Sequence, residues 1–442
     1  MSKRDEFDPR LKAYLHRGAG TPPPAGMEAR IIRGAPRRRA GWALQVAAAA
    51  AVLVLAIGLG VAVQRARQSA AVTPTASPLP SASTKATLSP TPTPSGTPYP
   101  LLSSASIHMV NASIGWAAGS GTNRILRTTD GGAHWSDVTP GGARAGAWTT
   151  FFLDGNRAWL ASSLQPGSSP DFSVAIYRTV DGGRSWQHTG DAAPDLGWPA
   201  SLDFVDSTHG WLFMNSGSAA GSEGVAFYGT VDGGTTWGKL SEADTSGAAG
   251  QLPLACSKGT PVFLSSSTGW LPGACSAGGG PFFDVTRDGG KTWRNVAMAL
   301  PAGWANCMCE IYSLRFSDAR NGVFALTNYS FAPVPESVLY TTADGGNSWR
   351  LGPSMPVQAY EVFFVDKSHG WTLNAKSNSL LATSDGGQHW SLVGPIPSTQ
   401  GVMGFQFVTT EIGWALPSDA QGRQSIVKTE DGGRTWTTQL AP

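Results

Sequence analysis

Seven aspartates are the side chains in this sequence with the clearest capacity for acid–base chemistry, because each recurs in one motif, T-x-D-G-G-x-x-W. A carboxylate can act as a general acid, a general base or a nucleophile. The motif repeats at intervals of 41 to 56 residues, and seven equivalent positions cannot all be one catalytic centre. We therefore interpret the aspartates as structural. They are Asp130, Asp181, Asp232, Asp288, Asp344, Asp385 and Asp431.

The composition of the motif fits a tight turn between two strands. A short aspartate side chain can accept hydrogen bonds from amides further along the turn, and the threonine hydroxyl can join the same network. The two glycines tolerate the positive φ angles that such turns require. The tryptophan then begins the next strand and can bury a large ring between neighbouring sheets.

A second signature precedes each motif and completes a four-stranded unit. It consists of a short apolar run that contains a phenylalanine, a polar turn, and usually Gly-Trp. We expect strand A to carry the phenylalanine, strand B to start near Gly-Trp, strand C to end at the motif's threonine, and strand D to start at its tryptophan. Seven such units over residues 101–442 predict an all-β fold, a seven-bladed β-propeller.

The repeated motif resembles the Asp-box, S/T-x-D-x-G-x-x-W, over about 340 residues. Asp-box propellers include sialidases, xyloglucan-cleaving hydrolases, sortilin-type receptors and photosystem II stability/assembly factors. The regular D-G-G and Gly-Trp spacing and the single seven-bladed size look most like the last group. That resemblance implies an extracytoplasmic propeller that binds proteins without catalysis.

The long, irregular segments are predicted on the face opposite the Asp-boxes, where the B–C and D–A loops lie, and such loops commonly carry function. Three tryptophans belong neither to the repeats nor to the apolar segment near the N-terminus, and all lie in D–A connections. With two tyrosines and an arginine they form our predicted partner-binding set: Trp148, Trp198, Trp304, Tyr312, Tyr360 and Arg144. Arg315 and Glu361 are charged residues close to this set. The alternative is that the rings plug the central channel or pack beneath loops.

Four cysteines are predicted outside the membrane, where disulfides form. Cys256 and Cys275 flank one A–B hairpin and should come opposite each other, so we favour that pair. Cys307 and Cys309 then pair with each other or stay reduced. The cysteine spacing and the absence of a nearby histidine do not fit a zinc site, and we predict no metal and no cofactor.

A glycoside hydrolase, sialidase-like or glucan-active, is the alternative function. Such enzymes need two carboxylates facing each other across a cleft. Acidic residues outside the repeats are sparse, and no pair stands out. The early F/Y-R-I-P signature of sialidases is also absent.

The N-terminal hundred residues predict a membrane anchor. Residues 1–41 form a basic, mostly disordered tail with ten Lys/Arg against four Asp/Glu, and residues 42–63 contain no charge. This 22-residue segment is long enough to span a bilayer, and the arginines before it place the tail in the cytoplasm. Residues 64–100 are a Pro/Ser/Thr/Ala-rich linker. A cleaved signal peptide is the rival interpretation, but it would need an unusually long leading tail.

The expected protein is therefore single-pass in a bacterial-type cell membrane, with its propeller outside. Its predicted partners are the membrane itself and an envelope or membrane protein, with a glycan as a second class. Residues 68–442 carry 20 Lys/Arg against 26 Asp/Glu, a balance that argues against nucleic acid as a ligand.

Overall fold

The computed structural model describes residues 105–441, except for positions 120–121, 145, 164–172, 193–196, 220, 246–249, 276–279, 331–335 and 375. The predicted tail (1–41), membrane span (42–63) and linker (64–100) lie outside the described residues. Within the part that is described, no helix has the length and apolar character needed to cross a bilayer.

The first three sheets follow one another along the chain. The first contains β1 (Ala105–Met109), β2 (Gly115–Gly119), β3 (Arg124–Thr128) and β4 (Ser136–Asp137). The second contains β5 (Trp148–Phe152), β6 (Ala158–Ser163), β7 (Val174–Thr179) and β8 (Gln187–Ala192). The third contains β9 (Trp198–Phe204), β10 (Gly210–Ala219), β11 (Ser222–Thr230), β12 (Gly238–Asp244) and the added β13 (Leu252–Pro253).

The remaining four sheets complete the ring. The fourth contains β14 (Ser257–Lys258), β15 (Val262–Phe263), β16 (Gly269–Ala274), β17 (Pro281–Thr286) and β18 (Arg294–Asn295). The fifth contains β19 (Cys309–Phe316), β20 (Gly322–Asn328), β21 (Glu336–Thr342) and β22 (Arg350–Ser354). The sixth contains β23 (Val362–Phe364), β24 (Gly370–Asn374), β25 (Ser379–Thr383) and β26 (Ser391–Pro395). The seventh contains β27 (Gly401–Phe407), β28 (Gly413–Ser418), β29 (Ile426–Thr429) and β30 (Thr437–Leu440).

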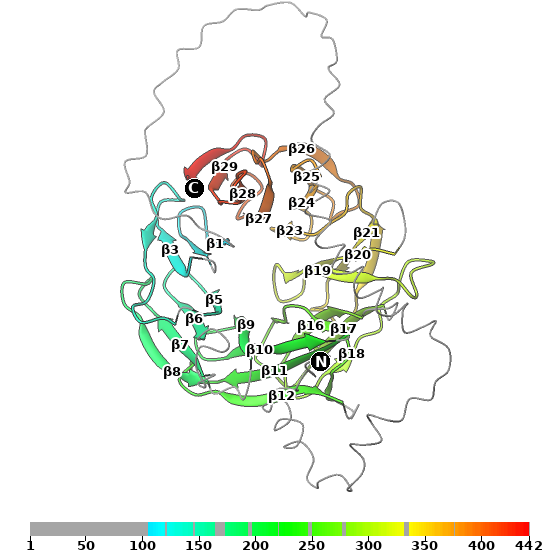
Figure 1. The fold of residues 1–442 in the computed structure, drawn as a ribbon. Helices are drawn as coiled ribbons and strands as arrows, with labels where there is room; N and C mark the ends of the chain where they lie inside the picture. Colours follow the sequence, from blue (N-terminus) through cyan, green and yellow to red (C-terminus); the bar gives the residue numbers. More distant parts are fainter. Residues whose placement is uncertain are drawn as a thin grey trace, which may run out of the picture. The chain divides into compact units, whose positions relative to one another are not determined.

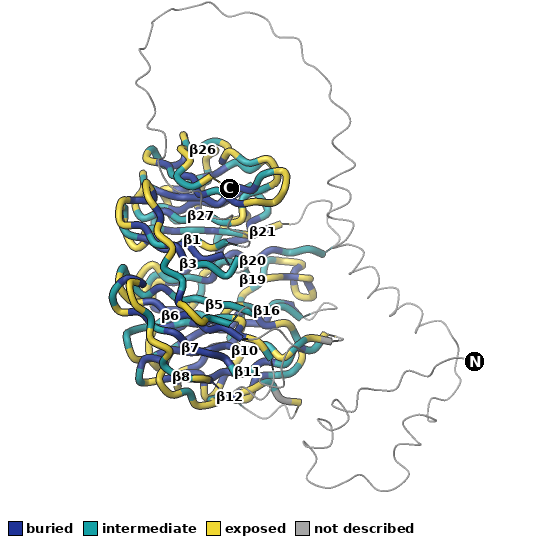
Figure 2. The backbone as a smooth tube through the Cα atoms, turned by 60° about the vertical axis from the view of Figure 1, so that its left-hand side comes forward, coloured by how far each residue is buried: buried dark blue, intermediate teal, exposed yellow. Residues whose placement is uncertain are grey.

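The seven sheets are the blades of a propeller, as predicted, and strand A of each blade lies nearest the axis (Figure 1). Strand A ends at the predicted phenylalanine in six blades and at Met109 in the first. Strand C ends at the motif's threonine in all seven. Strand D begins one residue after the motif's tryptophan rather than at it. Buried residues are concentrated in strands B and C, and exposed residues gather in the connections and on the outer strand D (Figure 2).

Neighbouring blades are joined by aromatic stacking. The ring of Trp159 on β6 lies 3.9 Å from that of Phe204 on β9, centroid to centroid, and Trp159 Nε1 donates to the carbonyl of Gly233 at 2.9 Å. Trp211–Phe263 and Trp371–Phe407 repeat this stack between later pairs of blades. The Gly of Gly-Trp leaves room for this phenylalanine, because a Cβ on Gly210 would meet Phe204 at 2.3 Å.

The ring closes between the last blade and the first. Gln406 on β27 accepts the N–H of Met109 at 2.7 Å and donates to its carbonyl at 2.8 Å. Trp414 Nε1 donates to Gly131 O at 3.1 Å, and Met109 and Trp414 share one apolar cluster. All four strands of the seventh blade come from its own unit, so side chains rather than an exchanged strand join these two blades in the described residues.

Candidate functional site

Each Asp-box turn is closed by its own hydrogen bonds. In the fifth blade, Thr342 Oγ1 donates to Asp344 Oδ1 at 2.8 Å and accepts from Gly346 N at 2.9 Å. Ser348 donates to the same aspartate from its amide at 3.0 Å and from its hydroxyl at 2.6 Å. These bonds hold the pKa of Asp344 at about 2, so the carboxylate stays ionised as an acceptor.

The Asp-boxes also bind the neighbouring A–B turns, which places both kinds of turn on one face. Gly345 N donates to Arg320 O at 2.8 Å, and the equivalent bond occurs in each of the other six blades. The pKa values of all seven box aspartates are lowered. A carboxylate that is ionised and already hydrogen-bonded to its own turn is poorly suited to general acid catalysis.

The opposite face carries the B–C and D–A connections, which we call the loop face. Two of the predicted binding rings are exposed there: Trp198, at the start of β9, is 36% exposed, and Tyr360, just before β23, is 43% exposed. Tyr312 on β19 lies edge-on to Tyr360, with ring centroids 5.7 Å apart. Trp198 and Tyr360 lie where strand A begins in the third and sixth blades, and Tyr312 is the fourth residue of strand A in the fifth blade.

The structure places the other predicted binding residues differently. Trp304 is only 6% exposed and packs in a core cluster with Cys307 and Cys309, so its ring offers almost no surface to a partner. Trp148 is half-buried against the second blade and donates to the carbonyl of Arg144. Arg144 in turn binds Ser173 and forms an ion pair with Asp191 at 3.4 Å.

A tyrosine cluster on the loop face links the fifth and sixth blades. Tyr312 donates to the carboxylate of Glu310, and its hydroxyl lies 2.8 Å from that of Tyr329. Burial raises the pKa of Tyr329 to about 12, and burial and the bond to Glu310 raise that of Tyr312 further. The cluster is therefore a set of neutral hydroxyls beside the exposed ring of Tyr360.

Strand A of every blade lines a cavity of about 760 Å³ on the propeller axis, which we call the axial channel. The residue just before the terminal Phe or Met of strand A contributes to the lining in all seven blades. These residues are His108, Phe151, Asp203, Val262, Arg315, Phe363 and Gln406. Side chains alternate along a strand, so the neighbour of a residue buried between blades must face the axis. Sequence reasoning did not single out His108 or Asp203, although this alternation could have identified both.

The charged groups of the axial channel come from separate blades. The guanidinium Cζ of Arg315 lies 4.0 Å from the ring centroid of Phe363. The charge of Glu361 acts on this guanidinium from a distance, and the two side chains form no direct ion pair. Burial raises the pKa of Asp203 and of Glu361 to about 7. Burial, reinforced by the charge of Arg315, lowers the pKa of His108 to about 4, so that imidazole is neutral.

Both carboxylates also have a structural use, because each accepts a hydrogen bond from strand A of the following blade. Asp203 Oδ2 accepts from Phe263 N at 2.7 Å, and Glu361 Oε1 accepts from Phe405 N at 3.3 Å. Ser313 plays the same part toward Val362, at 3.0 Å. Among the described residues, no group of three or more His, Cys, Asp or Glu is arranged to hold a metal ion.

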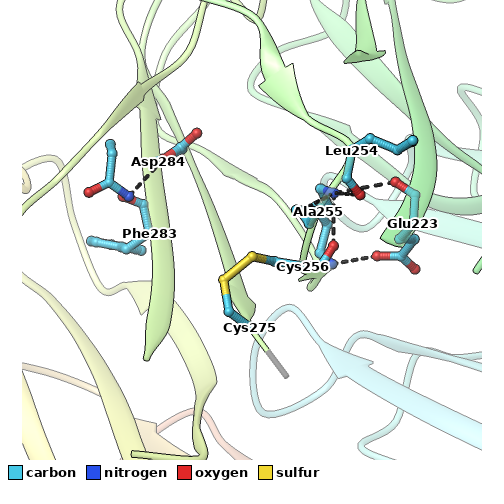
Figure 3. The surroundings of a disulfide bond; sticks show 9 residues. Glu223, Leu254, Ala255, Cys256, Cys275, Phe283 and Asp284 are labelled. Atoms are coloured by element: carbon cyan, nitrogen blue, oxygen red, sulfur yellow. Dashed lines mark hydrogen bonds between the residues drawn. A yellow bond between two sulfur atoms is a disulfide. The ribbon is translucent and has the colours of Figure 1, made fainter. Parts of the chain in front are cut away.

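A disulfide and a buried lysine shape the fourth blade beside the channel. Cys256 is bonded to Cys275, and Glu223 from the third blade lies next to this bond (Figure 3). Lys258 Nζ donates to the carbonyls of Leu254, Ala255 and Cys256 at 2.8 to 3.1 Å. Its pKa falls to about 8 because burial outweighs the nearby carboxylates.

This arrangement splits strand A of the fourth blade into β14 and β15. The segment between them carries Thr260 and Pro261, which line the axial channel. The second disulfide joins Cys307 to Cys309, directly beside the buried Trp304.

Comparisons with known proteins support the predicted resemblance. The chain is 25% identical, over 295 residues, to the photosystem II assembly lipoprotein Ycf48 of Synechococcus sp. (strain CC9902). The aligned region covers 59% of this chain and 79% of that protein. No family model matches the chain.

Solved structures that align with the chain include Ycf48 bound to a D1 peptide, at 17% identity and a TM-score of 0.48, covering 76% of this chain and 93% of that one. An α-L-arabinofuranosidase from Fusarium graminearum in complex with arabinobiose also aligns. It has 11% identity and a TM-score of 0.41, covering 64% of this chain and 91% of that one.

Proposed function

We propose that this chain is a non-catalytic binding propeller that recognises a protein partner through its loop face, as a factor in the assembly or stability of a membrane complex. The observation that carries the proposal is the sequence similarity to an assembly lipoprotein over 79% of that protein's length. The photosynthetic role of that relative is not part of the proposal.

The two faces of the propeller support the loop face as the recognition surface. The polar groups of the Asp-box turns are bonded within the turns themselves, and the same pattern recurs in every blade. The loop face instead exposes Trp198 and Tyr360 and differs from blade to blade. Aromatic side chains are enriched among the residues that dominate binding energy at protein interfaces.

The location of the protein is part of the same proposal. The uncharged segment 42–63 would anchor the chain, with the basic tail 1–41 in the cytoplasm and the propeller outside. The two disulfides support an oxidising compartment for the propeller. Alkaline extraction of membranes should leave the full chain in the membrane fraction, and release into the supernatant would contradict the anchor.

The binding function can be tested by partner capture from membranes of the producing organism. The full chain with both Trp198→Ala and Tyr360→Ala should capture about one tenth as much partner as the wild type, or less, because two exposed aromatic anchors are lost. Val231→Ala is the matched control, since Val231 is an apolar side chain that is 74% exposed in an Asp-box. Equal capture by the double variant, or a loss caused only by Val231→Ala, would contradict the proposal.

A glycoside hydrolase remains the competing function, because Asp203 and Glu361 place two carboxyls of raised pKa in the axial channel. The full chain should release no product from a panel of fluorogenic glycosides. Turnover abolished by Asp203→Asn or Glu361→Gln would replace the binding proposal with the enzymatic one.

A further inference from the structure

One cation in the axial channel lacks the hydrogen bonds that such a group requires. Arg315 contributes to the channel lining, and its Nη1 is buried with no hydrogen-bond partner among the described residues. A guanidinium carries five N–H donors, and a buried donor left unsatisfied costs free energy. The ring of Phe363 supports the cation from one side but provides no acceptor atom.

We propose that the axial channel binds a carboxylate group, with Arg315 as its counter-ion. The planar guanidinium can donate two parallel hydrogen bonds to a carboxylate, which is the geometry that arginine offers best. His108 is neutral and has an N–H that it can donate to the same anion. This inference rests on the proposed binding function and specifies which chemical group of a ligand enters the channel.

The other channel residues select this anion over other charged groups. At pH 6 Asp203 and Glu361 are mostly protonated, so a cationic ligand would meet chiefly the positive charge of Arg315. A phosphate dianion would bring a second negative charge for which the described lining has no counter-ion. A carboxylate carries a single charge and is flat, and the rings of Phe151 and Phe363 in the lining suit a flat group.

A ligand can reach this site from the surface, because exposed residues lie at both ends of the channel lining. Met403 on β27 is 62% exposed toward the loop face, and Val110 after β1 is 37% exposed toward the Asp-box face. Two sources of the carboxylate share this chemistry: a small free acid, or the acidic side chain of a partner segment lying across the loop face. Each source predicts a different binding result.

The affinity for a carboxylate should rise as the pH falls from 8 to 6. The pKa values of Asp203 and Glu361 are about 7, so both lose negative charge over this interval, while an ordinary carboxylic acid stays ionised. His108, the other titratable group of the described lining, stays neutral over this interval, and the remaining neighbours Gln406, Val262 and Phe151 do not titrate.

The test is isothermal titration of the full-length chain at pH 6 with benzoate and, separately, with the peptide acetyl-Gly-Gly-Glu-Gly-Gly-amide. Benzamide and the glutamine version of the peptide are neutral controls. Arg315→Gln should weaken binding by about tenfold or more, because it removes the counter-ion and its two donors. The matched variant is Arg350→Gln, a loss of the same charge at an exposed position on β22, which should bind like the wild type.

Glu361→Gln provides an independent test if Arg315→Gln does not fold. Glu361→Gln removes the competing carboxylate and should tighten benzoate binding at pH 8 by a few fold, so that the pH dependence becomes shallower. Binding of benzoate points to a small acid as the source, and binding of the peptide alone points to a partner side chain. No binding of either probe, or binding that Arg315→Gln leaves unchanged, would overturn the inference. Partner capture that depends on Trp198 and Tyr360 but not on Arg315 would leave the proposed function intact.

Discussion

The Asp-box turns and the axial channel are built from the same seven units, yet they use their polar groups in opposite ways. On the Asp-box face, Thr342, Asp344 and Ser348 bond to one another within a single turn. In the axial channel, by contrast, Arg315 has a buried donor without a partner among the described residues, and Asp203 and Glu361 have raised pKa values. The residues that repeat in all seven blades therefore form the scaffold, and residues that differ between blades are the ones available to bind a ligand.

The largest expected effect separates the aromatic joints from the exposed rings. Trp159→Ala should lower the free energy of unfolding by about 3–5 kcal/mol, because it removes a fully buried ring and its stack on Phe204. Trp198→Ala should cost less than about 1 kcal/mol, since its ring is partly exposed. Chemical denaturation of the two variants measures the difference. Equal losses would mean that Trp198 belongs to the scaffold.

The two disulfides should differ in how much each stabilises the fold. Replacing Cys256 and Cys275 with alanine should lower stability by about 3 kcal/mol, because that bond spans 19 residues of chain. The same replacement of Cys307 and Cys309 opens a separation of only two residues, and the loop-closure contribution there is about 1 kcal/mol. Thermal unfolding under non-reducing conditions compares the two pairs, and the reverse order would contradict this explanation.

A smaller effect is expected from a single turn of the Asp-box face. Thr342→Val keeps the shape of the side chain but removes the hydroxyl that donates to Asp344 and accepts from Gly346. The free energy of unfolding should fall by about 1–2 kcal/mol, with partner capture unchanged. A loss of capture without a loss of stability would place the binding surface on the Asp-box face instead.

The smallest expected change is in the slope of stability against pH, which should have opposite signs for the two regions. The folded-state pKa of Asp344 is lowered, so its contribution is present above the unfolded value near 3.8 and is lost as the pH falls toward 2. The folded-state pKa of Asp203 is raised to about 7, so the native state binds the extra proton and stability declines as the pH rises from 4 to 7. Asp203→Asn should flatten that decline in melting temperature, and an unchanged slope would show that this carboxyl is not desolvated.

The repeat allowed the architecture to be predicted from the sequence in detail. Phe204 and Thr342 lie at the strand ends where the pattern put them, because each is required by the packing or turn of its own blade. The position of Trp304 could not be read in the same way. Its ring is directed into the core by local turns, in which Trp304 N bonds to Pro301 O and Cys307 N bonds to Trp304 O.

Two channel residues, His108 and Asp203, were not predicted for a different reason, whereas Arg315 and Glu361 were expected near the binding set. His108 and Asp203 lie inside strands whose repeat pattern indicates a purely structural role, and the sequence features typical of function lie in the long loops. Their significance depends on seven strands meeting around one axis, which brings together residues that are up to about 300 positions apart in the sequence, as Met109 and Gln406 illustrate. A single unit gives no sign of this convergence.

The most direct test of the contrast between the faces is site-specific photo-crosslinking of the full chain in membranes of the producing organism. A photoreactive amino acid placed at Tyr360 reports on the loop face, and one placed at Val231 reports on the Asp-box face. We predict a discrete crosslinked protein from position 360 and none from position 231. A crosslinked partner from position 231 alone would contradict the assignment of binding to the loop face.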